Sequence, residues 1–171
     1  MVDLGALIRD VPDFPKQGIL FKDITTLLKD GPAFHQAIDL LSERLGPYPA
    51  DLVVGMESRG FIFAAPIAYL LGVGFVPVRK LGKLPGQVIS TEYDLEYGTN
   101  TLELHSDAIS PGDPVLIVDD LLATGGTVSA TIELVERLQG KVVAVAFLVE
   151  LRALAGRERL GDYEVISLIQ F

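Results

Sequence analysis

The sequence predicts an α/β domain with a mainly parallel central sheet and helices on both faces of that sheet. Short runs of consecutive apolar residues recur along the chain, and segments with apolar residues at helical spacing lie between them. Strands that are apolar throughout are typical of a sheet covered on both faces, and their alternation with helices favours parallel strands. The 171 residues contain no internal repeat and no long linker, so we expect one domain spanning residues 1–171.

The segment 1–30 is expected to form a small hood ahead of the sheet. A short amphipathic piece at 4–11 leads into a loop rich in proline and glycine at 12–24 (PDFPKQGILFKDI). Residues 30–32 (DGP) then begin a long helix, because proline is tolerated in the first helical turn, and residues 46–47 (GP) end it. The apolar residues that recur at helical spacing in it are Phe34, Ala37, Ile38, Leu41 and Leu45.

The middle of the chain predicts two buried strands, a helix between them and then a flap. The strands are expected at 51–55 and 73–78 and the helix at 61–71. Residues 80–98 are mostly polar and contain three glycines and a proline, so we expect a long mobile loop there. With an alternating, exposed strand at 99–105, this loop would form a flexible flap or hairpin over residues 79–105.

The last third of the chain predicts a buried strand, a helix and two more strands. The strand at 115–120 (VLIVDD) ends in two acids, and the residues ATGGT follow at 123–127. A helix with one apolar stripe comes next and stops at Gly140. The further strands are expected at 142–149 and 163–168.

Composition excludes several classes of partner. The net charge of −9 opposes binding to nucleic acid and to anionic lipid, and no apolar run approaches the length of a membrane span. The basic residues that do cluster, Arg79, Lys80 and Lys83, are typical of a small anion site. Without cysteines the chain has neither disulfides nor thiolate metal ligands. The first residues do not resemble a secretory signal, so a cytoplasmic protein is the default expectation.

Two acids and a glycine-rich loop form the strongest functional pattern. Carboxylates only accept hydrogen bonds, so Asp119 and Asp120 match the two hydroxyl donors of a sugar diol. A polar strand end that caps a helix, or half of a metal site, would use the same residues. The loop 123–127 brings small residues, hydroxyls and a helix N-terminus together, which favours phosphate binding. A phosphorylated ribose would satisfy both parts, and a plain tight turn is the alternative.

The spacing of this loop matches neither of two common phosphate-binding motifs. No Gly-Lys-Ser/Thr follows, and the glycines are adjacent and not spaced as in dinucleotide-binding loops. Instead, VLIVDDLLATGGT closely resembles the signature with which type I phosphoribosyltransferases bind 5-phosphoribosyl pyrophosphate (PRPP). Further segments resemble the adenine-specific members of that family along nearly the whole chain, and in order they are PDFPKQGILFKDI, VVGMESRGFIFAAPIA, VRKLGKLPG and STEYDLEYG.

The resemblance implies the reaction of adenine with PRPP to give AMP and pyrophosphate. It implies that Mg²⁺ takes part and is held mainly through PRPP and pyrophosphate, with few or no dedicated protein ligands. It also implies a homodimer. Asp119 and Asp120 would hold the ribose hydroxyls, and the 5′-phosphate would be wrapped by Ala123, Thr124, Gly125, Gly126 and Thr127.

The loop 57–60 (ESRG) resembles the pyrophosphate loop of the family. There Arg59 would face the leaving pyrophosphate and act in catalysis, and the peptide bond before it is often strained or cis. Arg79, Lys80 and Lys83 would close over the pyrophosphate from the flap. A solvated run of surface charges is the alternative for these three residues.

The resemblance also assigns the chemistry at the base. Glu96 in the flap would donate a proton or hydrogen bond to N7 of adenine, which requires a raised pKa, and Tyr97 would pack on the closed flap. Leu20 would pack on the purine face, and main-chain groups around Lys22 would bind its edge. Lys22 stands where many members carry arginine, so base affinity would suffer if a guanidinium stack matters there.

Three other functions fit parts of the pattern. A type I enzyme for xanthine, hypoxanthine or orotate would share the PRPP signature. A PRPP-sensing regulator that binds nucleic acid would need an added domain or a basic surface, which the length and charge of this chain oppose. A nucleotide-binding module without catalysis would not need the flap with Glu96.

Overall fold

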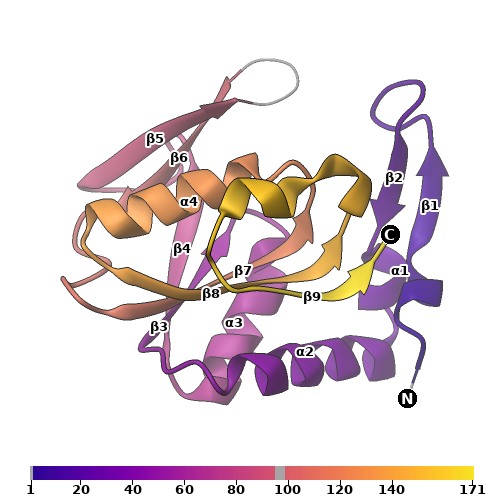
Figure 1. Cartoon of the computed structure of the whole chain (residues 1–171), viewed down its shortest axis with the longest axis horizontal. Coiled ribbons are helices and arrows are strands. Elements are labelled where there is room, and N and C mark those ends of the chain that lie inside the picture. The colour runs from indigo at the N-terminus through magenta and orange to yellow at the C-terminus, as the bar shows by residue number, and fades with distance from the viewer. Residues whose placement is uncertain (1, 95–98) are drawn as a thin grey trace.

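The computed structural model describes residues 2–94 and 99–171, and its centre is a seven-stranded sheet (Figure 1). Five adjacent strands of that sheet are parallel, and the two at one edge form an antiparallel hairpin. In spatial order the strands are β5 (Val88–Asp94), β6 (Thr99–His105), β4 (Gly74–Lys80), β3 (Leu52–Met56), β7 (Pro114–Leu122), β8 (Lys141–Glu150) and β9 (Val165–Gln170).

Helices cover both faces of the sheet, which confirms the predicted fold class. On one face, α3 (Gly60–Leu71) packs against β3 and β7, and α2 (Gly31–Leu45) packs against β8 and β9. On the other face, α4 (Gly126–Arg137) packs against β7, β8 and the β5–β6 hairpin. This arrangement explains why β7 is apolar throughout, since alternate residues of the strand enter two different cores.

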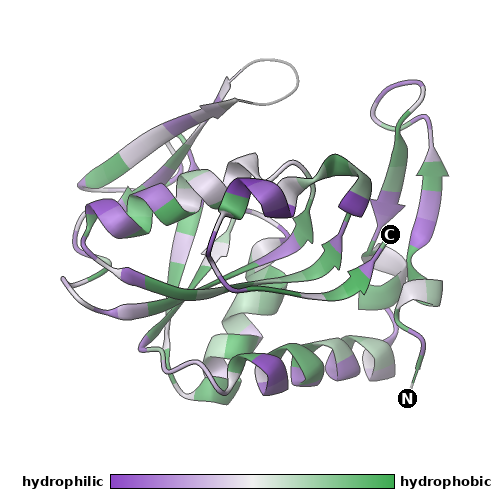
Figure 2. Cartoon of the chain, in the orientation of Figure 1, coloured by the Kyte–Doolittle hydropathy of each residue, from purple (hydrophilic) through white to green (hydrophobic). Residues whose placement is uncertain are grey.

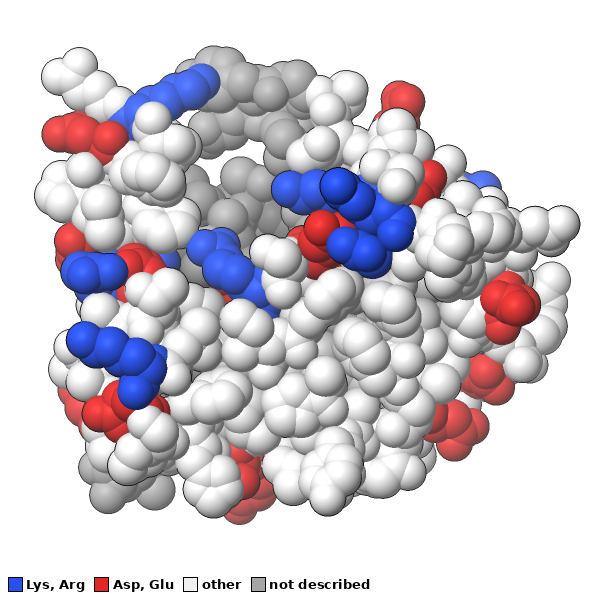
Figure 3. Space-filling view, turned by 180° about the vertical axis from the view of Figure 1, so that it is seen from behind, with Lys and Arg blue, Asp and Glu red and all other residues white. Residues whose placement is uncertain are grey.

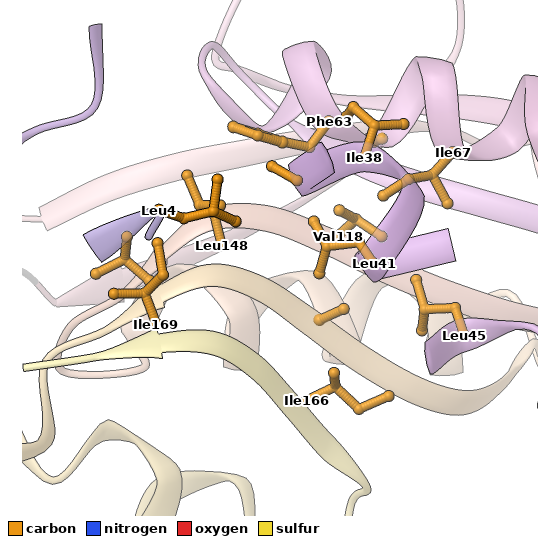
Figure 4. Packing of buried hydrophobic residues seen from close by; sticks show 14 of the residues in the cluster. Leu4, Ile38, Leu41, Leu45, Phe63, Ile67, Val118, Leu148, Ile166 and Ile169 are labelled. Atoms are coloured by element: carbon orange, nitrogen blue, oxygen red, sulfur yellow. The ribbon is translucent and has the colours of Figure 1, made fainter. Parts of the chain in front are cut away.

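Each face of the sheet has its own cluster of buried apolar side chains. Leu116 and Val118 of β7 face α2 and α3, whereas Val115 and Ile117 face α4. Figure 4 shows the first cluster, in which Phe63 of α3 lies among side chains of α2 and of the sheet. The sheet is therefore held from both sides, and its carboxyl edge is a rigid base for the loops that follow the strands.

The first long helix begins where the sequence indicates. The Asp30 carboxylate accepts a hydrogen bond from the Ala33 amide at 3.0 Å, a capping contact that satisfies one of the free amides of the first turn. Polar and apolar residues alternate around α2 in Figure 2, and the apolar residues predicted to face the core include the buried Ala37, Ile38, Leu41 and Leu45.

The expectation of a loop at 80–98 is wrong for part of that stretch, because Val88–Asp94 forms the strand β5. This strand pairs with β6 over its whole length, and its side adjoining α4 is fixed by a hydrogen bond from Thr91 Oγ1 to Glu133 at 2.8 Å. β6 is also less exposed than predicted, since its Leu102 and Leu104 are buried under α4. The loop was predicted from the glycines and the proline of this stretch. The β-branched residues of β5 favour a strand, and the strand forms.

A hairpin also replaces much of the loop expected at 12–24. β1 (Arg9–Pro12) and β2 (Leu20–Asp23) pair antiparallel as a separate two-stranded sheet, and the hood segment continues into the short α1 (Thr25–Leu28). Figure 1 places this hairpin beside the chain end that follows β9. Among the described residues, none of the helices has the length and apolar character needed to cross a membrane.

Candidate active site

The loops predicted to bind the substrate meet at one edge of the sheet. β3 is paired in parallel with β4 on one side and with β7 on the other, so the carboxyl ends of all three strands lie together. The loop 57–60 follows β3, the basic residues 79–83 end and follow β4, and the loop 123–127 follows β7. In parallel α/β sheets this edge is where ligands bind.

Asp119 and Asp120 lie near the end of β7, which continues through Leu122 and so extends two residues beyond the predicted carboxyl end. Both acids are buried, with 9% and 6% of their surface exposed. The Asp119 carboxylate accepts a hydrogen bond from the Asp120 amide at 2.9 Å. The longer strand holds both side chains on a fixed backbone, and a ligand would find the two carboxylates already oriented.

Arg59 joins the loop after β3 to this acid pair. Its Nε lies 2.7 Å from Asp120 Oδ2, and because that oxygen has no hydrogen bond of good geometry, the contact is an ion pair. The guanidinium also lies over the ring of Phe21 in the hood, at 5.4 Å from the ring centroid. Arg59 therefore contacts both the acid pair and the hairpin. In the loop 57–60 the cis peptide bond is that between Glu57 and Ser58, one bond before the one expected.

Gly60 allows the two loops to approach this closely. A Cβ atom at this position would stand 2.6 Å from Asp119 Oδ1 and 3.3 Å from the carbonyl oxygen of Val118. Both distances are shorter than ordinary contacts, so the start of α3 can lie against β7 only because residue 60 has no side chain.

Burial is the largest influence on the ionisation of the acid pair. It raises the pKa of Asp119 well above the ordinary range, and the adjacent Asp120 charge raises it further. Burial also raises the pKa of Asp120, although the Arg59 guanidinium acts in the opposite direction. Two buried acceptors with so little solvent around them favour a ligand that supplies hydrogen-bond donors.

The loop 123–127 forms a cradle at the start of α4. Gly125 has a φ of +83°, a left-handed conformation that glycine adopts without strain, and it is the cap of the helix. Within the described part of the chain, the backbone amides of residues 124–128 donate no hydrogen bond to another protein group. A pocket of about 60 Å³ lies within the loop, a volume suited to a small anion.

The other wall of this cradle was not predicted from the sequence. The short 3-10 helix η3 (Gly156–Leu160) lies directly against the loop: a Cβ atom on Gly156 would stand 2.1 Å from the Ala123 carbonyl oxygen. A Cβ atom on Gly125 would in turn stand 2.7 Å from the Gly156 carbonyl oxygen. The two segments are about 30 residues apart in sequence, and only the single glycine in GRE could have drawn attention to this contact.

The predicted basic cluster is partly neutralised by a residue of the loop after β3. The Glu57 carboxylate accepts hydrogen bonds from Arg79 Nε and from the Lys80 amide, both at 3.1 Å. Burial works against ionisation of Glu57, but these hydrogen bonds and the nearby cations leave its pKa below the ordinary value. Arg79 also donates to the Lys83 carbonyl oxygen at 3.1 Å, which folds the start of the flap back onto β4.

The side chains of Lys80 and Lys83 form no ion pair within the described residues. In Figure 3 most lysine and arginine side chains of the back face lie in its upper half and down its left side, while much of the lower half is uncharged. On this face, positive charge therefore lies mainly towards the carboxyl ends of the strands, although the chain as a whole is acidic.

The predicted base-binding residues lie on β2 of the hairpin. Leu20 is 50% exposed, as an apolar surface free to receive a ligand would be. The Lys22 ammonium lies 2.6 Å from Asp10 and 3.9 Å from the ring centroid of Phe171. Lys22 is therefore occupied by protein groups, and only its main chain is left for the role expected of it. Glu96 and Tyr97 lie outside the described residues.

The described residues contain no group of three or more His, Cys, Asp or Glu side chains placed to hold a metal. The acids nearest the site are each engaged by protein cations or amides: Glu57 by Arg79, and Asp120 by Arg59. Such a site fits a divalent ion that is held mainly by oxygens of a bound phosphate compound.

Comparison with known proteins agrees with this geometry. The model of the phosphoribosyl transferase domain family matches residues 25–171. The chain is 56% identical over 169 residues to an adenine phosphoribosyltransferase of Halothermothrix orenii, with 99% of each chain covered. Its structure superposes on the crystal structure of adenine phosphoribosyltransferase from Thermoanaerobacter pseudethanolicus with a TM-score of 0.96 at 56% identity, covering 99% of this chain and 98% of that one.

A ligand complex is also among the similar structures. The enzyme of Giardia lamblia, complexed with 9-deazaadenine, has a TM-score of 0.93 at 42% identity, with 99% of this chain and 96% of that one covered. The similarity therefore includes a relative whose site holds an analogue of adenine.

Proposed function

The chain belongs to the adenine phosphoribosyltransferase family, and we propose that it transfers the 5-phosphoribosyl group of PRPP to adenine, giving AMP and pyrophosphate. The observation that carries the proposal is the acid pair directly ahead of the amide cradle at 123–127. The acid pair can bind a diol, and the loop a few residues later can bind a phosphate. PRPP carries both groups.

PRPP would be anchored through its ribose 5-phosphate. Asp119 and Asp120 would accept hydrogen bonds from the ribose hydroxyls, and the free amides of the loop 123–127 would bind the 5′-phosphate, with the hydroxyls of Thr124 and Thr127 adding donors. The helix dipole of α4 adds a favourable potential for the phosphate charge. These contacts hold C1′ in a fixed position relative to the sheet.

The departing pyrophosphate would be stabilised by cations from two loops. Arg59 would contact it from the loop after β3, and Arg79, Lys80 and Lys83 would do so from the start of the flap. Negative charge grows on the pyrophosphate as the bond to C1′ breaks, so cations placed there lower the barrier. Glu57 supports this role by fixing the guanidinium of Arg79.

Adenine would bind between the hood and the flap. Leu20 would pack on the purine face, and main-chain groups around Lys22 would bind its edge. Glu96 would donate a proton or hydrogen bond to N7 while N9 attacks C1′, and Tyr97 would pack on the closed flap. Because the Lys22 side chain is engaged by Asp10 and Phe171, a lysine at this position is compatible with base binding through the backbone.

Mg²⁺ belongs to the proposal as an ion bound mainly to PRPP and pyrophosphate. It supplies charge neutralisation of the leaving pyrophosphate when bound. Asp119 and Asp120 stay with the ribose in this arrangement, and the four cationic side chains supply the remaining positive charge from the protein.

A homodimer is also part of the proposal, supported by an apolar surface on α3 and β4. Apolar side chains are exposed there within a broad uncharged area, which in Figure 3 lies over α3. The largest of them are Ile62, Tyr69, Leu70 and Phe75, and Tyr69 is 85% exposed. Surfaces of this kind mark protein–protein contacts. A cytoplasmic location completes the proposal, because PRPP and AMP are charged metabolites that do not cross membranes unaided.

A panel of bases tests the function directly. The protein is incubated with PRPP, Mg²⁺ and one of adenine, hypoxanthine, xanthine or orotate, and formation of the nucleoside monophosphate is followed. We expect conversion of adenine alone. Conversion of another base in preference to adenine would refute the assignment of the base, and conversion of none would refute the activity.

The role of Glu96 has its own test. Glu96→Gln removes the acidic proton but keeps the shape, so turnover should fall while the affinity for PRPP stays unchanged. Glu92→Gln, an exposed position on β5, is the matched control. Turnover equal to that of the control would refute the acid role.

A further inference from the structure

The phosphate loop is supported by a segment that the sequence motif does not contain. The backbone of η3 at Gly156 lies against Ala123 and Gly125, close enough that a side chain on either glycine would overlap the opposite backbone. The loop 123–127 thus has two sides, one facing the proposed phosphate and the other resting on η3. Any shift of η3 would reach the amides that bind the phosphate.

A charge network fixes η3, in which the exposed Arg157 pairs with a buried carboxylate. Glu150 at the end of β8 is 5% exposed, and it accepts hydrogen bonds from Arg157 Nε at 2.9 Å and from Arg157 Nη2 at 2.6 Å. Ser167 of β9 donates to the same carboxylate at 2.6 Å, and Arg157 Nη1 donates to the Val165 carbonyl oxygen at 2.8 Å. This is a two-pronged arginine–carboxylate pair, the geometry in which such contacts are strongest.

The network is attached to the strand that leads into the phosphate loop. Glu150 is paired in the sheet with Leu122, the last residue of β7, and the Leu151 amide donates to the Leu122 carbonyl oxygen at 2.9 Å. The residue that follows Leu122 is Ala123, whose carbonyl faces Gly156. A closed path therefore runs from β7 to β8 through the ion pair to η3 and back to the loop.

We propose that Arg157 is a positioning residue for PRPP: by its pairing with Glu150 it holds Gly156 as the fixed rear wall of the phosphate loop. This inference rests on the proposed function, because it assumes that the loop binds the 5′-phosphate. It concerns the shape of the cradle before the substrate arrives. Loss of the pairing loosens η3, and the amides of residues 124–128 then lose the arrangement that matches a phosphate.

The test is the variant Arg157→Gln, with Arg152→Gln as the matched control. Arg152 lies in the preceding 3-10 helix η2 (Arg152–Leu154), is exposed, and makes no side-chain hydrogen bond or ion pair within the described residues. Its charge acts on Glu150 without contact, so Arg152→Gln controls for the loss of a nearby positive charge and leaves the pairing intact. PRPP binding is measured by calorimetry with Mg²⁺, and the KM values of both substrates by initial rates. We expect the Kd and KM of PRPP to rise by about tenfold in R157Q, with the KM of adenine at saturating PRPP unchanged.

Two further measurements separate positioning from folding. The thermal midpoint of each variant shows whether it is folded, and Arg157→Lys keeps the charge but loses the two-pronged geometry, so it should recover only part of the PRPP affinity. An unchanged PRPP Kd in folded R157Q refutes the inference, as does an equal rise in both KM values. Wild-type protein that binds PRPP but converts no base would instead contradict the proposed function. The PRPP affinities of wild type and R157Q would then still decide the role of Arg157.

Discussion

Gly60 is the position where the smallest change should disturb the site most. In Gly60→Ala the new methyl group would stand 2.6 Å from Asp119 Oδ1, whereas ordinary contacts begin at 3.4 Å. The two groups must therefore separate by about 0.8 Å, the difference between these distances. The carboxylate cannot simply turn away, because the same oxygen accepts the hydrogen bond from the Asp120 amide.

The expected cost follows from that displacement. Forcing one extra methyl group into a packed interior destabilises a protein by about 1–3 kcal/mol. Displacement of a substrate-binding group by about 1 Å can reduce catalysis by roughly 100-fold. We therefore expect G60A to unfold at lower temperature and to raise the KM of PRPP by about 10- to 100-fold.

The assay is the initial rate of AMP formation at varied PRPP, together with a thermal melt. Gly31→Ala is the control, because a Cβ atom at residue 31 would have no atom within 4 Å. G31A should keep both the stability and the KM of PRPP. If folded G60A binds PRPP as tightly as G31A does, Asp119 does not hold the ribose in the way proposed.

Three further predictions concern ionisation and the hood. Burial raises the pKa of Asp119 above 3.8, so ionisation of this group destabilises the folded protein as pH rises above that value. Asp119→Asn should therefore raise the melting temperature at neutral pH. The same variant should weaken PRPP binding in calorimetry. The hydrogen bond from Arg9 lowers the pKa of Asp23 from 3.8 to about 2, so the stability that this bond adds is present above pH 3.8 and is lost as pH falls towards 2. The unfolding free energies of wild type and Arg9→Gln should therefore converge as pH falls towards 2. Curves that stay parallel over this range would contradict the prediction. Phe171→Ala removes the ring beneath Lys22 and should raise the KM of adenine but not that of PRPP, whereas Phe171→Tyr should behave as wild type.

The sequence was sufficient for the features that depend on local patterns. Consecutive apolar residues indicated β7 as a strand buried on both faces, and the sequence placed the acid pair at its end and a glycine-rich turn at the start of the next helix. Residues 88–94 were misjudged, because glycine and proline nearby outweighed their β-branched side chains in the prediction. Local propensity predicts a strand poorly where pairing with a neighbouring strand stabilises it.

Local sequence patterns did not predict contacts between segments that are far apart in the sequence. Nothing in the spacing of residues indicates that Gly156 lies against Ala123, that Phe21 lies by Arg59, or that Phe171 lies by Lys22. Each of these contacts arises from the way strands and loops pack at the carboxyl edge, which depends on the whole fold. The charges of Arg79 and Glu57 were visible in the sequence, but not that they pair.

Among the residues that the structure describes, the β1–β2 hairpin is a separate two-stranded sheet that shares no strand pairing with the seven-stranded one. Sugar and phosphate would be held by backbone and acids of the central sheet, whereas the purine would meet a module attached beside it. At positions other than Phe21, which lies against Arg59, mutation can therefore explore new nucleobase preferences in the module at little risk to the common anchor. Directed evolution towards a different base should therefore start with substitutions in the hairpin.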